Sequence, residues 1–200
     1  DPYANPRKTT TIRRPGPVDI AALKAAVLAL PESVWAAENA DKPNRFEALD
    51  KTRHIVFRFV DSVRDWRGSH DRPAWAEWRA LLEPVMQAAV APYGYANGQF
   101  PRVMFARMAP GGEIKPHRDA NAAAKWPHKI HVPLLTNDKV TFFVDGVGYH
   151  LPEGDAAEVN NMGVHAVKND GETDRIHLIF EYFDPDQPAP EWLARVLANA

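Results

Sequence analysis

The second half of the sequence is a succession of short β-like runs separated by turn-forming residues. After Gln99 these runs follow one another at roughly ten-residue spacing, with Gly, Asn, Asp and Pro between them. They are RVMFARMA, KIHVPLLT, KVTFFVDG, GYHLPEGD, AEVNN, GVHAVKND and DRIHLIFEYF. Asp145-Gly146 adds a hairpin signal. This pattern is typical of a β-sandwich or barrel, so we predict a mostly β fold with flanking helices.

The first half of the sequence carries most of the helical patterns. VDIAALKAAVLAL (18–30) is rich in Ala and Leu at helical spacing, and PAWAEWRALLEPVMQAAV (73–90) also predicts a helix, which Pro84 should kink or divide. Between them, HIVFRFV (54–60) has the β-branched and aromatic character of a strand. Residues 1–17 are polar and contain proline, which indicates an arm or an edge strand.

Length and composition restrict the classes of protein that remain. We expect one domain of 200 residues, with a mainly helical support in 1–99, the β core in 100–183 and a closing helix in 184–200. The formal charge of −2 and the lack of a basic block argue against nucleic acid as a partner. No apolar run approaches the roughly 18 residues that a membrane span needs. The absence of cysteine excludes thiolate chemistry and favours the cytoplasm.

A possible metal site begins in GGEIKPHRDANAAAKW, where one residue separates His117 from Asp119. Along a strand, residues two apart point to the same face, so both side chains can aim inward while Arg118 points away. One imidazole and one carboxylate leave a divalent metal underbound. A second histidine would complete the face of two histidines and one carboxylate that suits non-haem Fe(II) and leaves coordination positions open.

Several histidines could supply the third ligand: His128, His131, His150, His165 and His177. The context favours His165, because a Gly-containing turn leads into its β-like run and Arg175 follows ten residues later. The rigid fork of arginine matches a carboxylate and stays charged. A dicarboxylate such as 2-oxoglutarate could therefore be anchored at one end while its 2-oxo acid chelates the metal, which leaves a position for O2. His54 has no comparable partners in the sequence, so no role in the site is predicted for it.

The segments PHRD, HVPL and VH-x9-R-IHLIF resemble the aspartyl/asparaginyl β-hydroxylase-like branch of the Fe(II)/2-oxoglutarate dioxygenases, and bacterial cis-proline hydroxylases share this pattern. The similarity covers roughly residues 100 to 183. It implies a double-stranded β-helix, the jelly-roll or cupin-like barrel, buttressed here by the N-terminal helices. It also implies Fe(II), with 2-oxoglutarate and O2 as co-substrates.

The resemblance assigns roles residue by residue. Fe(II) would be held by His117, Asp119 and His165, and Arg175 would bind the distal carboxylate of 2-oxoglutarate. His131 matches a strand histidine that helps to hold the co-substrate. Two departures stand out. Asp119 is present, whereas the animal enzymes lack this carboxylate, and Ala106 stands where those enzymes have a serine.

Three further residues are candidates for the substrate site. Arg107, on a predicted strand, would bind a substrate carboxylate or else form a surface ion pair. Trp126 would cap the active-site mouth from a loop or else be buried in the core. His177 shares a strand face with Arg175 and would have either a substrate-related or a structural role.

The sequence thus predicts an Fe(II)- and 2-oxoglutarate-dependent hydroxylase that acts on an amino acid or an Asp/Asn-like side chain and releases succinate and CO2. Its partner would be a small molecule or a peptide. Two alternatives stay open. One is a cupin-like metalloenzyme that does not use 2-oxoglutarate, and Arg175 argues against it. The other is a non-catalytic jelly-roll binding module, which tight metal binding would exclude.

Overall fold

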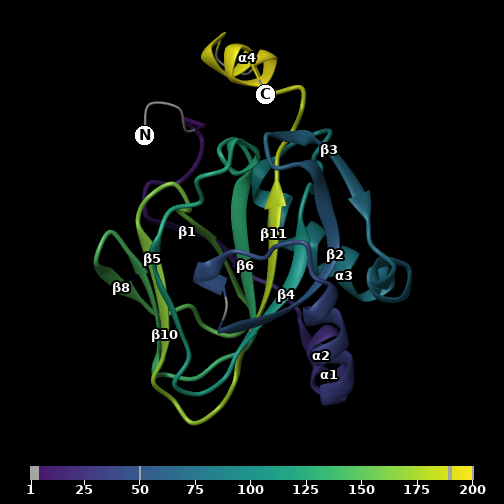
Figure 1. Ribbon diagram of the computed structural model, residues 1–200, viewed down its shortest axis with the longest axis vertical. Helices are drawn as coiled ribbons and strands as arrows, with labels where there is room; N and C mark the ends of the chain where they lie inside the picture. The colour runs from purple at the N-terminus through teal and green to yellow at the C-terminus, as the bar shows by residue number, and fades with distance from the viewer. Residues whose placement is uncertain (1–4, 50, 189–190, 200) are drawn as a thin grey trace.

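The computed structural model of the protein consists of two antiparallel sheets that pack against each other, with helices on one side (Figure 1). The structure describes residues 5–49, 51–188 and 191–199. Residues 1–4 of the predicted arm, residues 189, 190 and 200 of the predicted C-terminal segment, and residue 50 lie outside the described residues.

Among the described residues, the larger sheet has seven strands in the order β1-β9-β6-β11-β4-β2-β3, and the smaller sheet has four in the order β5-β10-β7-β8. The larger sheet contains β1 (Ile12–Pro17), β9 (Asp155–Val159), β6 (His128–Leu135), β11 (Arg175–Tyr182), β4 (Val103–Met108), β2 (Thr52–Ser62) and β3 (Asp65–Asp71). The smaller sheet contains β5 (Glu113–His117), β10 (His165–Asn169), β7 (Val140–Val144) and β8 (Val147–Tyr149). All strand pairs among the described residues are antiparallel, and most join strands that lie far apart in the sequence.

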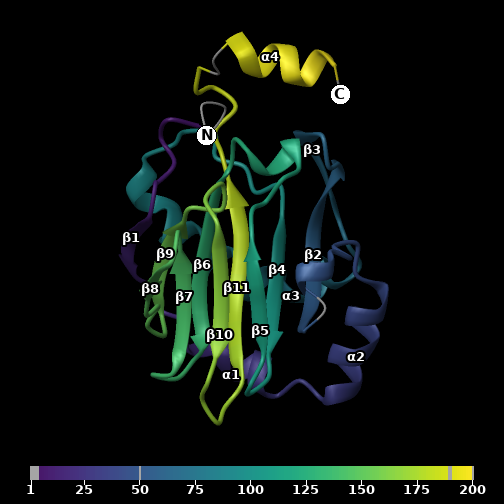
Figure 2. The ribbon, with the colours of Figure 1, turned by 60° about the vertical axis from the view of Figure 1, so that its left-hand side comes forward.

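The helices are α1 (Ala21–Leu28), α2 (Glu32–Asp41), α3 (Ala74–Val90) and α4 (Glu191–Ala198), with short 3-10 turns at Glu47–Leu49, Ala91–Tyr93 and Ala122–Ala124. Side chains of α1, α2 and α3 pack on the face of the larger sheet that is turned away from the smaller one; we call it the outer face. Helix α4 lies beyond one end of the sheets (Figure 2). None of the helices in the described part of the chain is long and apolar enough to cross a bilayer.

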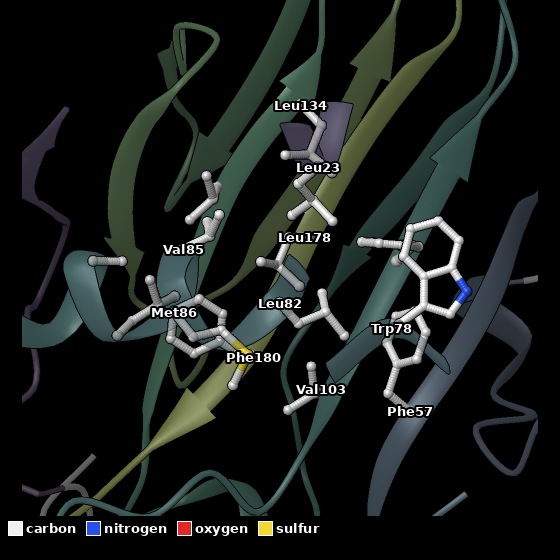
Figure 3. Close-up of a cluster of buried hydrophobic side chains, with 14 of the residues drawn as sticks. Leu23, Phe57, Trp78, Leu82, Val85, Met86, Val103, Leu134, Leu178 and Phe180 are labelled. Carbon is white, nitrogen blue, oxygen red and sulfur yellow. The ribbon is translucent and has the colours of Figure 1, made fainter. Parts of the chain in front are cut away.

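The main hydrophobic core lies between the outer face and the helices. Leu82 and Met86 of α3 pack there with Leu178 and Phe180 of β11 (Figure 3). Because side chains alternate along a strand, the residues between them on β11 point to the inner face, toward the smaller sheet. Each long strand therefore supplies apolar residues to the core on one side and leaves the other side for the space between the sheets.

The structure confirms the predicted mostly β fold with flanking helices. The predicted strand at 54–60 lies within β2, and the predicted helix at 73–90 is α3, which contains Pro84. Asp145 and Gly146 have φ angles of 47° and 82°, as a tight hairpin between β7 and β8 requires. Helix α2 and strand β3 were not predicted. β3 is mostly exposed and polar, so it lacks the apolar alternation that would identify it.

Candidate metal centre and cavity

His117, Asp119 and His165 come together between the two sheets. His117 is the last residue of β5, His165 is the first of β10, and the two are directly paired in the antiparallel register. Asp119 lies beyond the end of β5, where its backbone N–H donates to the Asn161 carbonyl. His117 and Asp119 thus face the same point as expected, although Asp119 lies beyond the strand and not on it. Arg118 was expected to point away but also lines the cavity. Each residue offers one ligand atom, and these atoms lie within 4.8 Å of one another.

Backbone carbonyls fix the orientation of both imidazoles. The Nδ1 atom of His117 lies 2.9 Å from the Lys115 carbonyl oxygen, and that of His165 lies 3.1 Å from the Gly163 carbonyl oxygen. A carbonyl only accepts, so each Nδ1 carries the proton and each Nε2 keeps a free lone pair. The two Nε2 atoms are 3.7 Å and 3.6 Å from Asp119 Oδ1. Three electron-pair donors thus surround one point, as a metal ion would require.

The second carboxylate oxygen of Asp119, Oδ2, contacts Asn161 and Lys129 on the side away from the imidazoles. It accepts a 3.1 Å hydrogen bond from Asn161 Nδ2 and lies 3.8 Å from Lys129 Nζ. Burial alone would raise the pKa of Asp119, but Lys129, His165 and Asn161 together hold it at about 2. The carboxylate is therefore ionised. Asn161 in turn accepts a 2.6 Å hydrogen bond from the buried Lys8, so the N-terminal arm supports this ligand.

The three residues lie in the wall of a cavity of about 540 Å³ between the sheets. Its other lining residues are mostly apolar, among them Phe59, Met104, Ala106, Ile114, Phe142, Val159, Val167 and Ile179. Its polar lining includes His131, Lys129 and Arg175. An apolar cavity with a few convergent polar groups is the usual form of a small-molecule site.

Arg175, the first residue of β11, is the least satisfied of these groups. It is 1% exposed, and only its Nη2 atom is engaged, 2.9 Å from His177 Nδ1. Nε and Nη1 have no hydrogen-bond partner among the described residues. Burial lowers the pKa of Arg175 to about 9, so the group remains charged at neutral pH. A buried cation without a counter-charge among the described residues is costly, so this position is suited to an anion.

His177 and His131 lie next to this guanidinium and are neutral. Burial, together with Arg175, holds the pKa of both imidazoles well below its usual value. Because a guanidinium can only donate, His177 Nδ1 is an acceptor, and His131 Nδ1 approaches the same atom at 3.0 Å. His131 lines the cavity, whereas His177 supports Arg175 from the same strand. Among the three, only Arg175 contributes a net charge.

Arg107 and Trp126 lie away from the cavity. Arg107 forms an ion pair on the outer face, and Trp126 is buried in a hydrophobic cluster. Arg107 is on the outer face of β4, where it donates to Glu32 Oε1 at 2.7 Å and covers the ring of Trp35. Strand alternation explains this, because its neighbour Ala106 is the residue that faces the cavity. Trp126 is 4% exposed and stacks on Trp66 in a hydrophobic cluster. Neither side chain lines the cavity.

Residues of the N-terminal half also line the cavity, and no sequence pattern predicts this. Asn44, Thr52 and His54 contribute to the wall, and all three are buried. The Oδ1 atom of Asn44 and the Oγ1 atom of Thr52 have no hydrogen-bond partner among the described residues. No motif links these positions to the H-x-D segment; the pairing of β2 with β4 brings Thr52 and His54 to the site, and Asn44 lies in the connection before β2.

Two facing antiparallel sheets with two histidines and one carboxylate between them define a class of protein, the double-stranded β-helix with a cupin-like metal centre. The model of the family "Aspartyl/Asparaginyl beta-hydroxylase" matches residues 80–185, more than half of the chain. The chain belongs to the aspartyl/asparaginyl β-hydroxylase family, a branch of the 2-oxoglutarate- and Fe(II)-dependent oxygenases.

The chain is also similar in fold to several solved structures. One is an oxidoreductase of the 2OG-Fe(II) oxygenase family from Burkholderia pseudomallei (16% identity, TM-score 0.51, covering 82% of this chain and 90% of that one). AviO1 from Streptomyces viridochromogenes Tue57 has 18% identity and a TM-score of 0.56, covering 90% and 93%. SnoN, a non-heme α-ketoglutarate-dependent epimerase from nogalamycin biosynthesis, has 14% identity and a TM-score of 0.55, covering 90% and 87%. At these identities the likeness is one of fold. No curated protein sequence matched the chain.

Proposed function

We propose that this protein is an Fe(II)- and 2-oxoglutarate-dependent hydroxylase that acts on a free amino acid or on an Asp/Asn-like side chain of a peptide, with succinate and CO2 as products. His117, Asp119 and His165 would hold the iron. Arg175 would bind the distal carboxylate of 2-oxoglutarate, with His131 beside it. The presence of Asp119 favours the bacterial amino-acid hydroxylases within the family as the nearer functional model.

The observation that carries the proposal is the buried, unpaired guanidinium of Arg175 in the cavity that also contains the three donor atoms. A cupin-like metalloenzyme that does not use 2-oxoglutarate has no need of such a group. A dicarboxylate fits it, because one carboxylate can neutralise Arg175 while the 2-oxo acid at the other end reaches the metal. The donor set of two imidazoles and one carboxylate likewise suits Fe(II) with open positions.

When bound, ferrous iron, 2-oxoglutarate and O2 together supply the oxidant that hydroxylates an unactivated C–H bond. The protein's own residues prepare the site for this chemistry. The Lys115 and Gly163 carbonyls hold the two imidazoles in the tautomer with Nε2 free. Asn161 and Lys129 keep Asp119 ionised and turned toward the imidazoles. The apolar lining excludes bulk water from the reacting groups.

The experiment is a succinate-release assay with Fe(II), ascorbate and 2-oxoglutarate across a panel of free amino acids and short peptides. We expect at least one compound to raise succinate above the substrate-free background. The signal should disappear in His165→Ala and in Arg175→Met, whereas Arg107→Met serves as a matched control on the opposite face. Full activity in His165→Ala would defeat the ligand assignment.

The same variants separate the remaining alternatives. An enzyme that binds metal but not 2-oxoglutarate would retain its metal affinity in Arg175→Met, and wild-type protein would show no 2-oxoglutarate binding. A non-catalytic binding module would fail to bind Fe(II) or Mn(II) stoichiometrically, and His165→Ala would then leave its metal content unchanged.

A further inference from the structure

The pairing of three strands brings a threonine and a histidine of the N-terminal half to the level of Arg175. Across β2, β4 and β11, Thr52 pairs with Met108, and Met108 pairs with Arg175. One step along, His54 pairs with Ala106, and Ala106 with His177. Thr52 and Arg175 are thus two strands apart, about 10 Å between backbones, which side chains from both sides can span.

On the strand between them, Met108 lies between Thr52 and Arg175, and Ala106 lies between His54 and His177. Ala106 and Met108 of β4 carry no hydrogen-bond donor in their side chains. Ala106 lines the cavity, and its small side chain opens the space between His54 and His177. A ligand group held by Arg175 can therefore extend over Ala106 to the side chains of β2.

Thr52 and His54 both line the cavity, and each side chain carries a hydrogen-bond donor. Thr52 is 1% exposed, and its hydroxyl has no partner among the described residues. The Nδ1 atom of His54 lies 3.1 Å from Lys42 Nζ. Since an ammonium only donates, Nδ1 accepts and Nε2 carries the hydrogen. Burial lowers the pKa of His54 to about 3, so the imidazole is neutral and this tautomer persists at physiological pH.

We propose that Thr52 and His54 complete, together with Arg175, the binding site for the distal carboxylate of 2-oxoglutarate. This inference rests on the proposed function. A carboxylate offers about four acceptor positions, and one edge of the Arg175 guanidinium can fill at most two of them. The Thr52 hydroxyl and His54 Nε2–H supply donors for the others. Asn44 stands outside this set, because its unpaired Oδ1 atom is an acceptor and would repel a carboxylate.

The test measures binding rather than turnover. Mn(II)-loaded protein is titrated with 2-oxoglutarate by calorimetry, and in parallel with 2-oxopentanoate, in which a methyl group replaces the distal carboxylate. Thr52→Val removes the hydroxyl and keeps the side-chain shape. His54→Asn keeps a partner for Lys42 but removes the donor at Nε2. Thr52→Ser and His54→Gln retain a donor and serve as the matched controls.

We expect Thr52→Val and His54→Asn each to weaken 2-oxoglutarate binding about tenfold to a hundredfold, as for the loss of a hydrogen bond to a charged group. Binding of 2-oxopentanoate should be unchanged, and Thr52→Ser and His54→Gln should bind 2-oxoglutarate nearly as well as wild type. Equal losses for both compounds would overturn the inference, since they would indicate a packing defect. Unchanged 2-oxoglutarate binding in both variants would also overturn it. If only Arg175→Met, and neither Thr52→Val nor His54→Asn, loses 2-oxoglutarate binding, the proposed function stands without this inference. If the wild-type protein does not bind 2-oxoglutarate, the proposed function itself fails.

Discussion

The two faces of the larger sheet are made by the same strands but differ in how tightly they are packed and in whether their polar groups have partners. On β11, Ile176, Leu178 and Phe180 point to the outer face and are buried with the apolar side chains of the helices. Arg175 and His177 alternate with them and point to the inner face. The outer face is a packed hydrocarbon interior, whereas the inner face contains a charged group with unused donors.

This difference indicates how stability and binding are divided in the molecule. Each buried apolar side chain on the outer face contributes favourable free energy when the chain folds. Each unpaired polar group on the inner face costs free energy until a ligand satisfies it. The N-terminal helices stabilise the sheet and so allow it to carry the unfavourable groups next to the cavity.

The largest expected effect concerns the inner face. His165→Ala removes one of the three proposed metal ligands, so we expect metal affinity to fall by more than about 100-fold and succinate release to be lost. The outer core is untouched, so the fold should persist. Metal content after dialysis, measured beside the far-ultraviolet circular dichroism spectrum, tests both statements. Wild-type metal content would contradict the first.

Sequence reasoning could find the candidate metal centre because His117 and Asp119 are two residues apart and the step from His165 to Arg175 matches a family pattern. The expectation that His165 and Arg175 lie on neighbouring strands is wrong, because β10 and β11 follow each other in the chain but belong to opposite sheets. Thr52 and His54 could not be found in this way. They come to the cavity through the pairing of β2 with β4, about fifty residues farther along, and nothing in their local sequence encodes that register.

The same contrast explains what was predicted of the fold. The apolar runs of β4, β6, β7 and β11 follow from burial, because these strands are covered by side chains on one face or both. β3, DWRGSHD, is an exposed edge strand that pairs with β2 through its backbone. Backbone pairing leaves little trace in side-chain composition, so such a strand is not predicted from its residues.

The second prediction concerns a substitution in the hydrophobic core on the outer face. Phe180→Ala removes a fully buried ring from the core between β11 and the helices. We expect the free energy of unfolding to fall by about 3–5 kcal/mol, from lost burial and the cavity that remains. Chemical denaturation measures this loss. At temperatures where the variant is folded, its metal affinity should match that of wild type, and a large drop would show that the two faces are coupled.

The third prediction is that a substitution on the inner face raises the free energy of unfolding, whereas Phe180→Ala lowers it. Arg175→Met replaces a buried, unpaired cation with an apolar side chain of similar length. We expect the free energy of unfolding to rise by about 1–3 kcal/mol in the absence of ligand, because the desolvation cost disappears. 2-Oxoglutarate should stabilise the wild type but not the variant against thermal unfolding. A variant less stable than the ligand-free wild type would mean that the guanidinium is compensated in a way that its contacts do not reveal.

The fourth prediction concerns the polar edge of the outer face, where Glu158 of β9 is buried beside His128 and Tyr93. Burial alone would raise the pKa of Glu158, but His128, the Thr9 N–H and the Tyr93 hydroxyl lower it below its ordinary value of 4.5. A lowered pKa in the folded state stabilises the protein above pH 4.5, and this contribution is lost as the pH falls through the folded-state value. Glu158→Gln should therefore lose less stability than wild type between neutral and acidic pH in urea denaturation. An identical acid dependence would exclude Glu158 as a contributor.

The smallest effect on stability and binding is expected for a substitution of Arg107, which lies on the outer face of the same sheet. Arg107 pairs with the well-exposed Glu32 and covers Trp35, so Arg107→Met should change the free energy of unfolding by no more than about 1 kcal/mol. Metal affinity, 2-oxoglutarate affinity and succinate release should equal those of wild type. The comparison with Arg175→Met is sharp, because both variants replace arginine by methionine on adjacent strands of one sheet. If Arg107→Met weakened binding of the substrate, the cavity would extend through the sheet to its outer face, and the division between a stabilising face and a binding face would fail.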